Sequence, residues 1–131
     1  MPKIEKKKVL IIEDEQTLIK ALEAALGEEN ISLAVAVDGE SGLELAKVFR
    51  PDIILLDIIL PKLNGFEVLK QLKKNKATAG IPVLILSNLG DETDIAKGIE
   101  GGAVGYLVKA NYKIEEVIQK IREILKQKKA Q

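Results

Sequence analysis

The sequence contains neither cysteine nor histidine among its 131 residues. Without cysteine there is no disulfide framework, no thiol nucleophile and no thiolate metal site. Without histidine the chain lacks the commonest general base and the commonest zinc ligand. Any chemistry that the protein performs must therefore use carboxylates, hydroxyls, lysines or a bound ion.

An excess of charge of one sign is also missing. Lys and Arg together number 20, and Asp and Glu together number 20. Proteins that bind nucleic acids or membrane surfaces usually carry a basic excess, so this balance argues against direct binding to either.

Long hydrophobic runs are absent as well. The longest apolar runs are too short to span a bilayer. Only residues 9–12 follow the basic N-terminal stretch as an apolar segment, which is too few for the core of a signal peptide. We therefore expect a cytoplasmic protein that is not attached to a membrane.

Four short apolar runs predict buried β-strands. They are nearly continuous and rich in Val and Ile, which is typical of parallel strands covered on both faces. They occupy residues 9–13, 52–57, 82–87 and 105–109. A fifth run, at residues 31–37, is more mixed and is expected to form an edge strand.

Apolar residues at helical spacing separate these runs. They predict five helices, around residues 18–26, 43–49, 66–72, 91–100 and 114–125. The fourth has only Ile95, Ala96 and Ile99 as its apolar stripe, and it contains Gly98, so we expect it to be the least rigid. The alternation of strands and helices predicts an α/β fold, a (βα)5 doubly wound sheet of five parallel strands.

Polar side chains stand where four of the five predicted strands end. They are Glu13, Asp14, Asp57, Ser87 and Lys109. Each one alone has an ordinary explanation as a cap, a turn residue or a solvated side chain. In open α/β sheets, however, functional residues gather at the carboxyl ends of the strands. Carboxylates there would bind Mg²⁺, while an ammonium and a hydroxyl would contact the oxygens of a phosphoryl group.

Asp57 is the candidate nucleophile of this set. It lies within a long apolar run, and an ionised carboxylate is costly to bury unless other groups pair with it. Carboxylates are known to form acyl phosphates as covalent intermediates. The strand-end residues would supply the partners that Asp57 needs.

The strand-end residues belong to four longer motifs, which follow one another as "VLIIED", "PDIILLDIILPKLNGFEVL", "PVLILSN" and "GAVGYLVKA". With them the chain resembles the receiver domain of bacterial two-component response regulators (CheY-like), over about residues 8–127. The resemblance implies the flavodoxin-like strand order 2-1-3-4-5. It also implies a single receiver domain at residues 1–131, either stand-alone or truncated from a longer protein.

The resemblance further implies a function in signalling. Asp57 would accept a phosphoryl group from a histidine on a partner kinase or phosphotransfer protein, in a reaction that needs Mg²⁺ or Mn²⁺. Asp14 would bind the metal directly and Glu13 through water, and Asp57 and the backbone carbonyl of Ile59 would complete the protein ligands. The chain would catalyse only its own phosphorylation and slow dephosphorylation, and is not otherwise an enzyme.

Four further residues match the phosphoryl-binding and switch positions of that family. Lys109 would pair with the aspartate and then with the phosphoryl group, and Ser87 would move to donate a hydrogen bond to it. Asn88 follows the hydroxyl, where its amide would donate to the phosphoryl group or narrow its access. Tyr106 matches the aromatic switch residue; its alternative role is that of a partly buried strand tyrosine. The added charge would change the surface formed by the fourth helix, fifth strand and fifth helix, for a downstream protein target. We expect a monomer or a weak dimer.

Three features depart from the family pattern. One is Asn88, because the family usually has a small residue after the hydroxyl. Ala110, rather than proline, follows Lys109, and a cis bond before alanine costs about 2.5–4 kcal/mol. Either the loop holds that cost or the bond is trans. Ile59 and Leu89 stand where polar residues often orient the hydrolytic water, so we predict slow autodephosphorylation.

Three other functions are weighed against this one. A degenerate receiver would act as a protein-interaction module without phosphate; the retained strand-end residues oppose it, whereas Asn88 and Ala110 leave it open. A phosphatase that uses an aspartyl phosphate would commonly have a second aspartate where Ile59 stands. A flavin-binding electron carrier would need a phosphate-cradling loop after the first strand, where the acidic residues 13–15 would repel phosphate.

Overall fold

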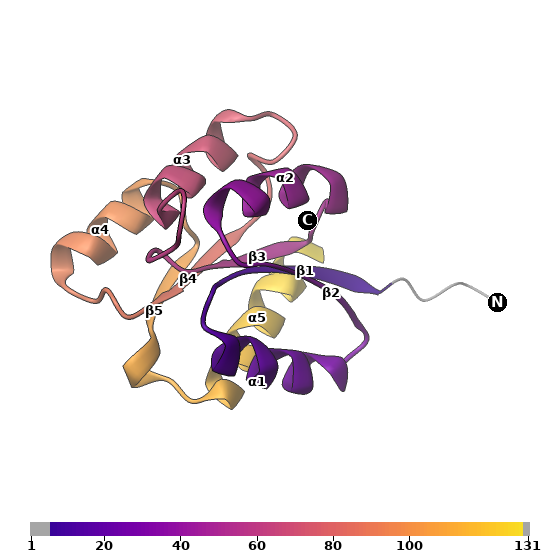
Figure 1. Cartoon of the computed structure of the whole chain (residues 1–131). Helices are drawn as coiled ribbons and strands as arrows, with labels where there is room; N and C mark the ends of the chain where they lie inside the picture. The colour runs from indigo at the N-terminus through magenta and orange to yellow at the C-terminus, as the bar shows by residue number, and fades with distance from the viewer. Residues whose placement is uncertain (1–5, 130–131) are drawn as a thin grey trace.

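Strands and helices alternate along the computed structural model, which describes residues 6–129, and the side chains of residues 6–127 (Figure 1). The strands are β1 (Lys7–Ile12), β2 (Ile31–Ala36), β3 (Ile53–Leu56), β4 (Val83–Ser87) and β5 (Gly105–Val108). The helices are α1 (Gln16–Gly27), α2 (Gly39–Phe49), α3 (Gly65–Lys74), α4 (Glu92–Glu100) and α5 (Ile114–Lys129), with a short 3-10 helix, η1 (Lys109–Asn111).

The five strands form one parallel sheet in the order β2-β1-β3-β4-β5. This confirms the predicted (βα)5 fold, the strand order and the placement of β2 at an edge. The direction of winding reverses at β1, which pairs with β2 on one side and β3 on the other. Ile12 pairs with Leu56, so the residues that follow these two strands leave the sheet side by side.

Helices cover both faces of the sheet. In Figure 1, α1 and α5 lie on one face, and α2, α3 and α4 lie on the other. Val9 and Ile11 point into the core beneath α1 and α5, whereas Leu10 and Ile12 point into the core beneath α2 and α3. All four are 0% exposed. A strand buried on both faces has no polar side to present, which explains its continuous apolar run.

The prediction for the apolar stripe of α4 was partly wrong. Ala96 is exposed and Ile99 is 47% exposed. The buried position of this helix is Gly98, where an added Cβ would lie 2.7 Å from the Ile85 side chain and 2.8 Å from the Tyr106 ring. Because the glycine lets α4 approach the sheet closely, the helix packs through its smallest residue.

No cis peptide bond occurs among residues 6–129, so the Lys109–Ala110 bond is trans. Of the two alternatives that the sequence left open, a strained cis bond and a trans bond, the second is correct. The chain instead continues from β5 directly into η1.

None of the helices described between residues 6 and 129 combines the length and hydropathy needed to cross a bilayer.

Candidate functional site

The carboxyl ends of β1 and β3 place two acidic side chains next to each other. The Asp57 N–H donates a hydrogen bond to the Ile12 carbonyl at 3.0 Å, which extends the pairing of these strands by one residue. The Glu13 N–H donates to the Ala36 carbonyl of β2 at 2.9 Å. Both carboxylates are therefore held on ordered backbone, and their residues are only 3% and 5% exposed.

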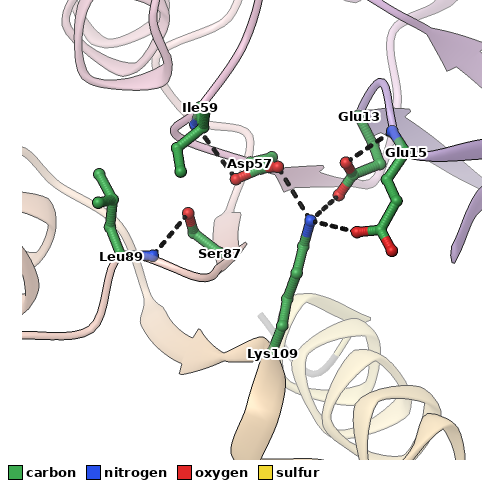
Figure 2. Close-up of polar contacts among 7 residues, drawn as sticks. All are labelled: Glu13, Glu15, Asp57, Ile59, Ser87, Leu89 and Lys109. Atoms are coloured by element: carbon green, nitrogen blue, oxygen red, sulfur yellow. Dashed lines mark hydrogen bonds and ion pairs between the residues drawn. The ribbon is translucent and has the colours of Figure 1, made fainter.

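Lys109 joins Glu13, Glu15 and Asp57 into one cluster, drawn in Figure 2. Together with the neighbouring Asp14, these residues are called the acidic cluster. Its Nζ lies 3.0 Å from Glu13 Oε1, 3.0 Å from Asp57 Oδ2 and 3.1 Å from Glu15 Oε1. The Lys109 side chain is 13% exposed. One ammonium thus faces three carboxylates, so the cluster carries an excess of negative charge, and two of these carboxylates, Glu13 and Asp57, are buried.

The electrostatic consequence is largest at Glu13. Burial raises the pKa of Glu13 to about 7, and the nearby Asp57 carboxylate acts in the same direction. Hydrogen bonds from the Glu15 N–H and the Lys109 ammonium oppose this rise. Burial alone would lower the pKa of Lys109, but its bonds to Glu13, Asp57 and Glu15 raise it above its usual value. The ammonium therefore stays charged, while Glu13 gains a proton readily.

The donor set of the cluster suits a hard divalent cation. Glu13, Asp14 and Asp57 each offer a carboxylate oxygen, and these oxygens lie within 4.8 Å of one another. Asp14 is exposed, so the cluster opens to solvent on one side. Magnesium prefers a few carboxylate oxygens and retains several waters. The acidic cluster provides such oxygens, and its open side leaves room for water.

The contribution of Glu13 to the stability of the protein without Mg²⁺ is expected to fall as the pH rises from about 4.5 to about 7. The pKa of Glu13 is about 7 in the folded protein and has an ordinary value of 4.5. Between these values the folded state binds more protons than the unfolded state, so raising the pH favours unfolding, by on the order of 2 kcal/mol. Bound Mg²⁺ favours the ionised carboxylate, and its stabilising effect should grow over the same interval. Urea unfolding at several pH values, with and without Mg²⁺, measures both effects.

Glu13→Gln is the control for this pH dependence. Other carboxyl groups, such as that of Asp38, have lowered pKa values and make the folded protein more stable as the pH rises. The comparison with Glu13→Gln isolates the contribution of Glu13, because all other groups are shared. Identical dependence on pH in the two proteins would show that Glu13 does not titrate in this interval.

Ser87 and Tyr106 both form hydrogen bonds with the backbone of Leu89. The Ser87 side chain is fully buried, and its Oγ accepts a hydrogen bond from the Leu89 N–H at 3.4 Å. The Tyr106 hydroxyl donates to the Leu89 carbonyl at 2.6 Å. Burial raises the pKa of Tyr106 to about 12, so the phenol remains protonated and able to donate. The short loop before α4 is therefore held from both sides.

The remaining predicted positions lie at the rim. The Ile59 N–H donates to Asp57 Oδ1 at 3.2 Å, and the Ile59 side chain is 54% exposed. Asn88 is exposed beside Ser87, and its side chain forms no hydrogen bond with any residue that the structure describes.

Glu15 is a member of the cluster that sequence reasoning missed. It stands at the N-cap of α1, but its side chain makes no capping hydrogen bond and turns instead to Lys109. Its signal in the sequence is weak, because an acidic residue before a helix is common. Only the distance to Lys109 reveals its role in the cluster.

Gly65, the first residue of α3, packs directly behind Asp57. Its N–H donates to the Ile58 carbonyl at 2.8 Å. A Cβ at this position would collide with the Asp57 carbonyl oxygen and would lie 2.5 Å from Ile58 Cα. Both obstacles are backbone, which cannot move aside as a side chain can.

Gly65→Ala is therefore expected to lower the free energy of unfolding by about 2 kcal/mol, the usual cost of overpacking. The measurement is urea unfolding. Gly27→Ala, at the end of α1, is the control, because a Cβ there meets no atom within 4 Å. It should leave stability unchanged or raise it slightly. An equal loss in both variants would show that the collision is not the cause.

Comparisons with known proteins agree on one family. The model of the family described as "Response regulator receiver domain" matches residues 9–122. Response regulator ArlR of Staphylococcus saprophyticus is 40% identical over 119 residues, which are 91% of this chain and 52% of that protein. The solved receiver domain of the Francisella response regulator 1452 is 30% identical, with a TM-score of 0.85 over 93% of this chain and 98% of that chain. The phosphorylated cyanobacterial phytochrome response regulator RcpA is 28% identical, with a TM-score of 0.78 over 91% of each chain.

The chain spans about half the length of the curated relatives it matches. The matched residues 9–122 include four whole strands, all of β1 except its first two residues, and Glu13, Asp14, Glu15, Asp57 and Lys109. Sequence, strand order and overall structure thus lead to the same assignment. The chain belongs to the response regulator receiver domain family of two-component signalling proteins.

Proposed function

We propose that Asp57 accepts a phosphoryl group from a histidine of a sensor kinase or phosphotransfer protein, in a reaction that depends on Mg²⁺. One observation carries the proposal. The Asp57 carboxylate is buried at the end of β3, with Oδ2 on the Lys109 ammonium and with the oxygens of Glu13 and Asp14 within 4.8 Å. Within this family a nucleophilic carboxylate beside a cation site is suited to form an acyl phosphate.

The residues of the cluster would divide the chemistry among them. An oxygen of Asp57 forms a bond to phosphorus as the bond between phosphorus and the donor nitrogen breaks. Asp14, Asp57 and the Ile59 carbonyl would hold Mg²⁺, with Glu13 acting through water. The metal would neutralise phosphoryl oxygens. Lys109, already charged and 3.0 Å from Asp57, would stabilise the same oxygens.

The new charge would then change the surface formed by α4, β5 and α5. A phosphoryl group supplies strong acceptors, so the Ser87 hydroxyl would turn toward it. That movement ends the contact with the Leu89 N–H, and Leu89 also holds the Tyr106 hydroxyl. Tyr106 and the start of α4 would shift together, and a downstream protein would recognise the result.

In this proposal residues 1–131 form one cytoplasmic receiver domain, with its core at about residues 8–127.

The test is phosphorylation by a small phosphodonor, such as acetyl phosphate, followed by intact-mass measurement. We expect the protein to gain one phosphoryl group when Mg²⁺ is present and none when it is chelated. Hydroxylamine should remove the group, as it does from acyl phosphates. No gain of mass, together with unchanged NMR spectra after addition of beryllofluoride, would overturn the proposal in favour of a degenerate receiver.

The phosphorylated protein is expected to lose its phosphoryl group slowly, and Ile59→Asn should shorten its lifetime roughly tenfold. The Ile59 side chain is 54% exposed beside Asp57 and offers no hydrogen bond to an attacking water. An asparagine amide would orient that water, and one such hydrogen bond, worth about 1.4 kcal/mol in the barrier, gives this factor. Ile99→Asn, on the 47% exposed Ile99 of α4, is the control. An unaltered lifetime in Ile59→Asn would refute the explanation.

A further inference from the structure

A groove of about 590 Å³ lies between α3 and α4, away from the acidic cluster. The two helices lie next to each other on one face of the sheet, as Figure 1 shows. Four of the nine residues that line the groove are lysines, and the full set is Asn64, Phe66, Glu67, Leu69, Lys70, Lys73, Lys74, Lys97 and Gly101.

The groove carries a local excess of positive charge, although the whole chain is balanced at 20 basic and 20 acidic residues. Lys70, Lys74 and Lys97 are exposed. Among residues 6–127, no carboxylate lies within ion-pair distance of any of the four lysines in the groove. Glu67 is the only acidic residue in the lining, and it accepts a hydrogen bond from the Gln71 amide.

Apolar side chains accompany these charges. Leu69 is 1% exposed and the Phe66 ring is half-buried. The Lys97 ammonium lies 4.4 Å from the centre of the Phe66 ring, so it is fixed by a cation–π contact rather than by an acid. Lys73 donates to the Ala79 and Ile81 carbonyls at 3.1 and 2.9 Å, which makes it part of the wall.

From this combination we infer that the groove between α3 and α4 binds an acidic segment of a partner protein. Carboxylates of the segment would pair with Lys70, Lys74 and Lys97, and an apolar side chain would contact the exposed part of Phe66. Opposite charge on the partner speeds association and suppresses wrong partners, while an apolar contact at the centre supplies binding energy. This groove shares α4 with the surface formed by α4, β5 and α5 that would respond to phosphorylation, but its other wall is α3.

A partner in this groove would contact two elements that lead back to the acidic cluster. α3 follows the loop in which the Gly65 N–H bonds to the Ile58 carbonyl, directly after Asp57. α4 follows Leu89, the residue that holds the Tyr106 hydroxyl. Binding and phosphorylation should therefore influence each other reciprocally. This coupling rests on the proposed function, whereas binding of the acidic segment does not.

The test uses the intact protein and a synthetic peptide rich in glutamate and leucine. NMR titration should shift the amide signals of Phe66, Leu69 and Gly101, and binding should weaken as salt is added. Lys70→Glu combined with Lys74→Glu should weaken binding by about tenfold or more. Lys20→Glu combined with Lys126→Glu, on exposed positions of α1 and α5, makes the same change of charge elsewhere and should weaken it less than about twofold.

Several results would overturn the inference. They are no binding of the peptide, signal shifts outside the groove, equal weakening in the two double variants, and equal binding of a peptide in which glutamine replaces every glutamate. Tighter binding of a single-stranded oligonucleotide than of the peptide would also overturn it, in favour of a nucleic-acid partner. None of these results depends on phosphorylation. If the unmodified protein binds the peptide but takes up no phosphoryl group, the proposed function fails and the groove assignment stands.

Discussion

Asp57→Asn is expected to take up no phosphoryl group from a small phosphodonor under conditions that should convert the unmodified protein. An amide keeps the size of the side chain, and its oxygen can still accept the hydrogen bond that Asp57 Oδ1 receives from the Ile59 N–H at 3.2 Å. It lacks the negative charge and the nucleophilic oxygen. Removal of a nucleophile commonly lowers a rate by roughly three orders of magnitude or more. Intact-mass measurement after incubation with acetyl phosphate and Mg²⁺ detects the difference.

The fold of Asp57→Asn should remain intact, which separates loss of chemistry from loss of structure. Lys109 keeps Glu13 and Glu15 as partners at 3.0 and 3.1 Å, so its ammonium is not left alone. Loss of one buried negative charge also relieves repulsion with Glu13. Glu23→Gln, on the exposed face of α1, is the matched control and should be phosphorylated as the unmodified protein is. A phosphoryl group that persists in folded Asp57→Asn would place the acceptor at another residue.

Lys109→Met is expected to have the second large effect, a loss of stability. Methionine keeps the apolar stem but removes the charge that faces Glu13, Glu15 and Asp57. Removing one partner of a buried ion pair leaves the other charge uncompensated and typically costs roughly 3 kcal/mol or more. Since small domains are stable by only about 5–15 kcal/mol, the loss is readily measured by urea unfolding.

The loss should depend on pH and on Mg²⁺ in a defined way. At pH 5 Glu13, whose pKa burial raises to about 7, is protonated and needs no partner, so the loss should be smaller than at pH 8. Saturating Mg²⁺ supplies positive charge to the same carboxylates and should restore part of the stability at pH 8. Lys113→Met, at an exposed position beyond η1, should change little at either pH. A loss in Lys109→Met that is equal at both pH values and insensitive to Mg²⁺ would mean that packing, not charge, is responsible.

The fold was predictable because its main features are encoded locally. A strand buried on both faces must be apolar throughout, and four runs meet that condition. β2 has only its last residue, Ala36, buried, and its more mixed sequence indicated an edge correctly. α4 was less predictable. Its closest approach to the sheet is made by Gly98, and a glycine carries no hydrophobic signal that a periodicity could detect.

The sequence predicted which residues form the candidate site better than it predicted which of them contact one another. Parallel strands carry their carboxyl ends to one edge, so Glu13, Asp57 and Lys109 were expected together. The Lys109 ammonium lies 3.0 Å from each of the two carboxylates. The third partner, Glu15, was missed because its choice between capping α1 and pairing with Lys109 depends on the folded geometry. Whether Ser87, Asn88 and Tyr106 act as a switch stays a prediction.

The contacts of Lys109 also bear on how the protein is made. Its partners lie 94 residues away at Glu15 and 52 residues away at Asp57, so the ammonium is the last charge of the cluster to leave the ribosome. A nascent chain that ends before β5 contains Glu13, Glu15 and Asp57 but not the cation that balances their charge. Completion of the cluster thus coincides with completion of the sheet, because Lys109 directly follows β5.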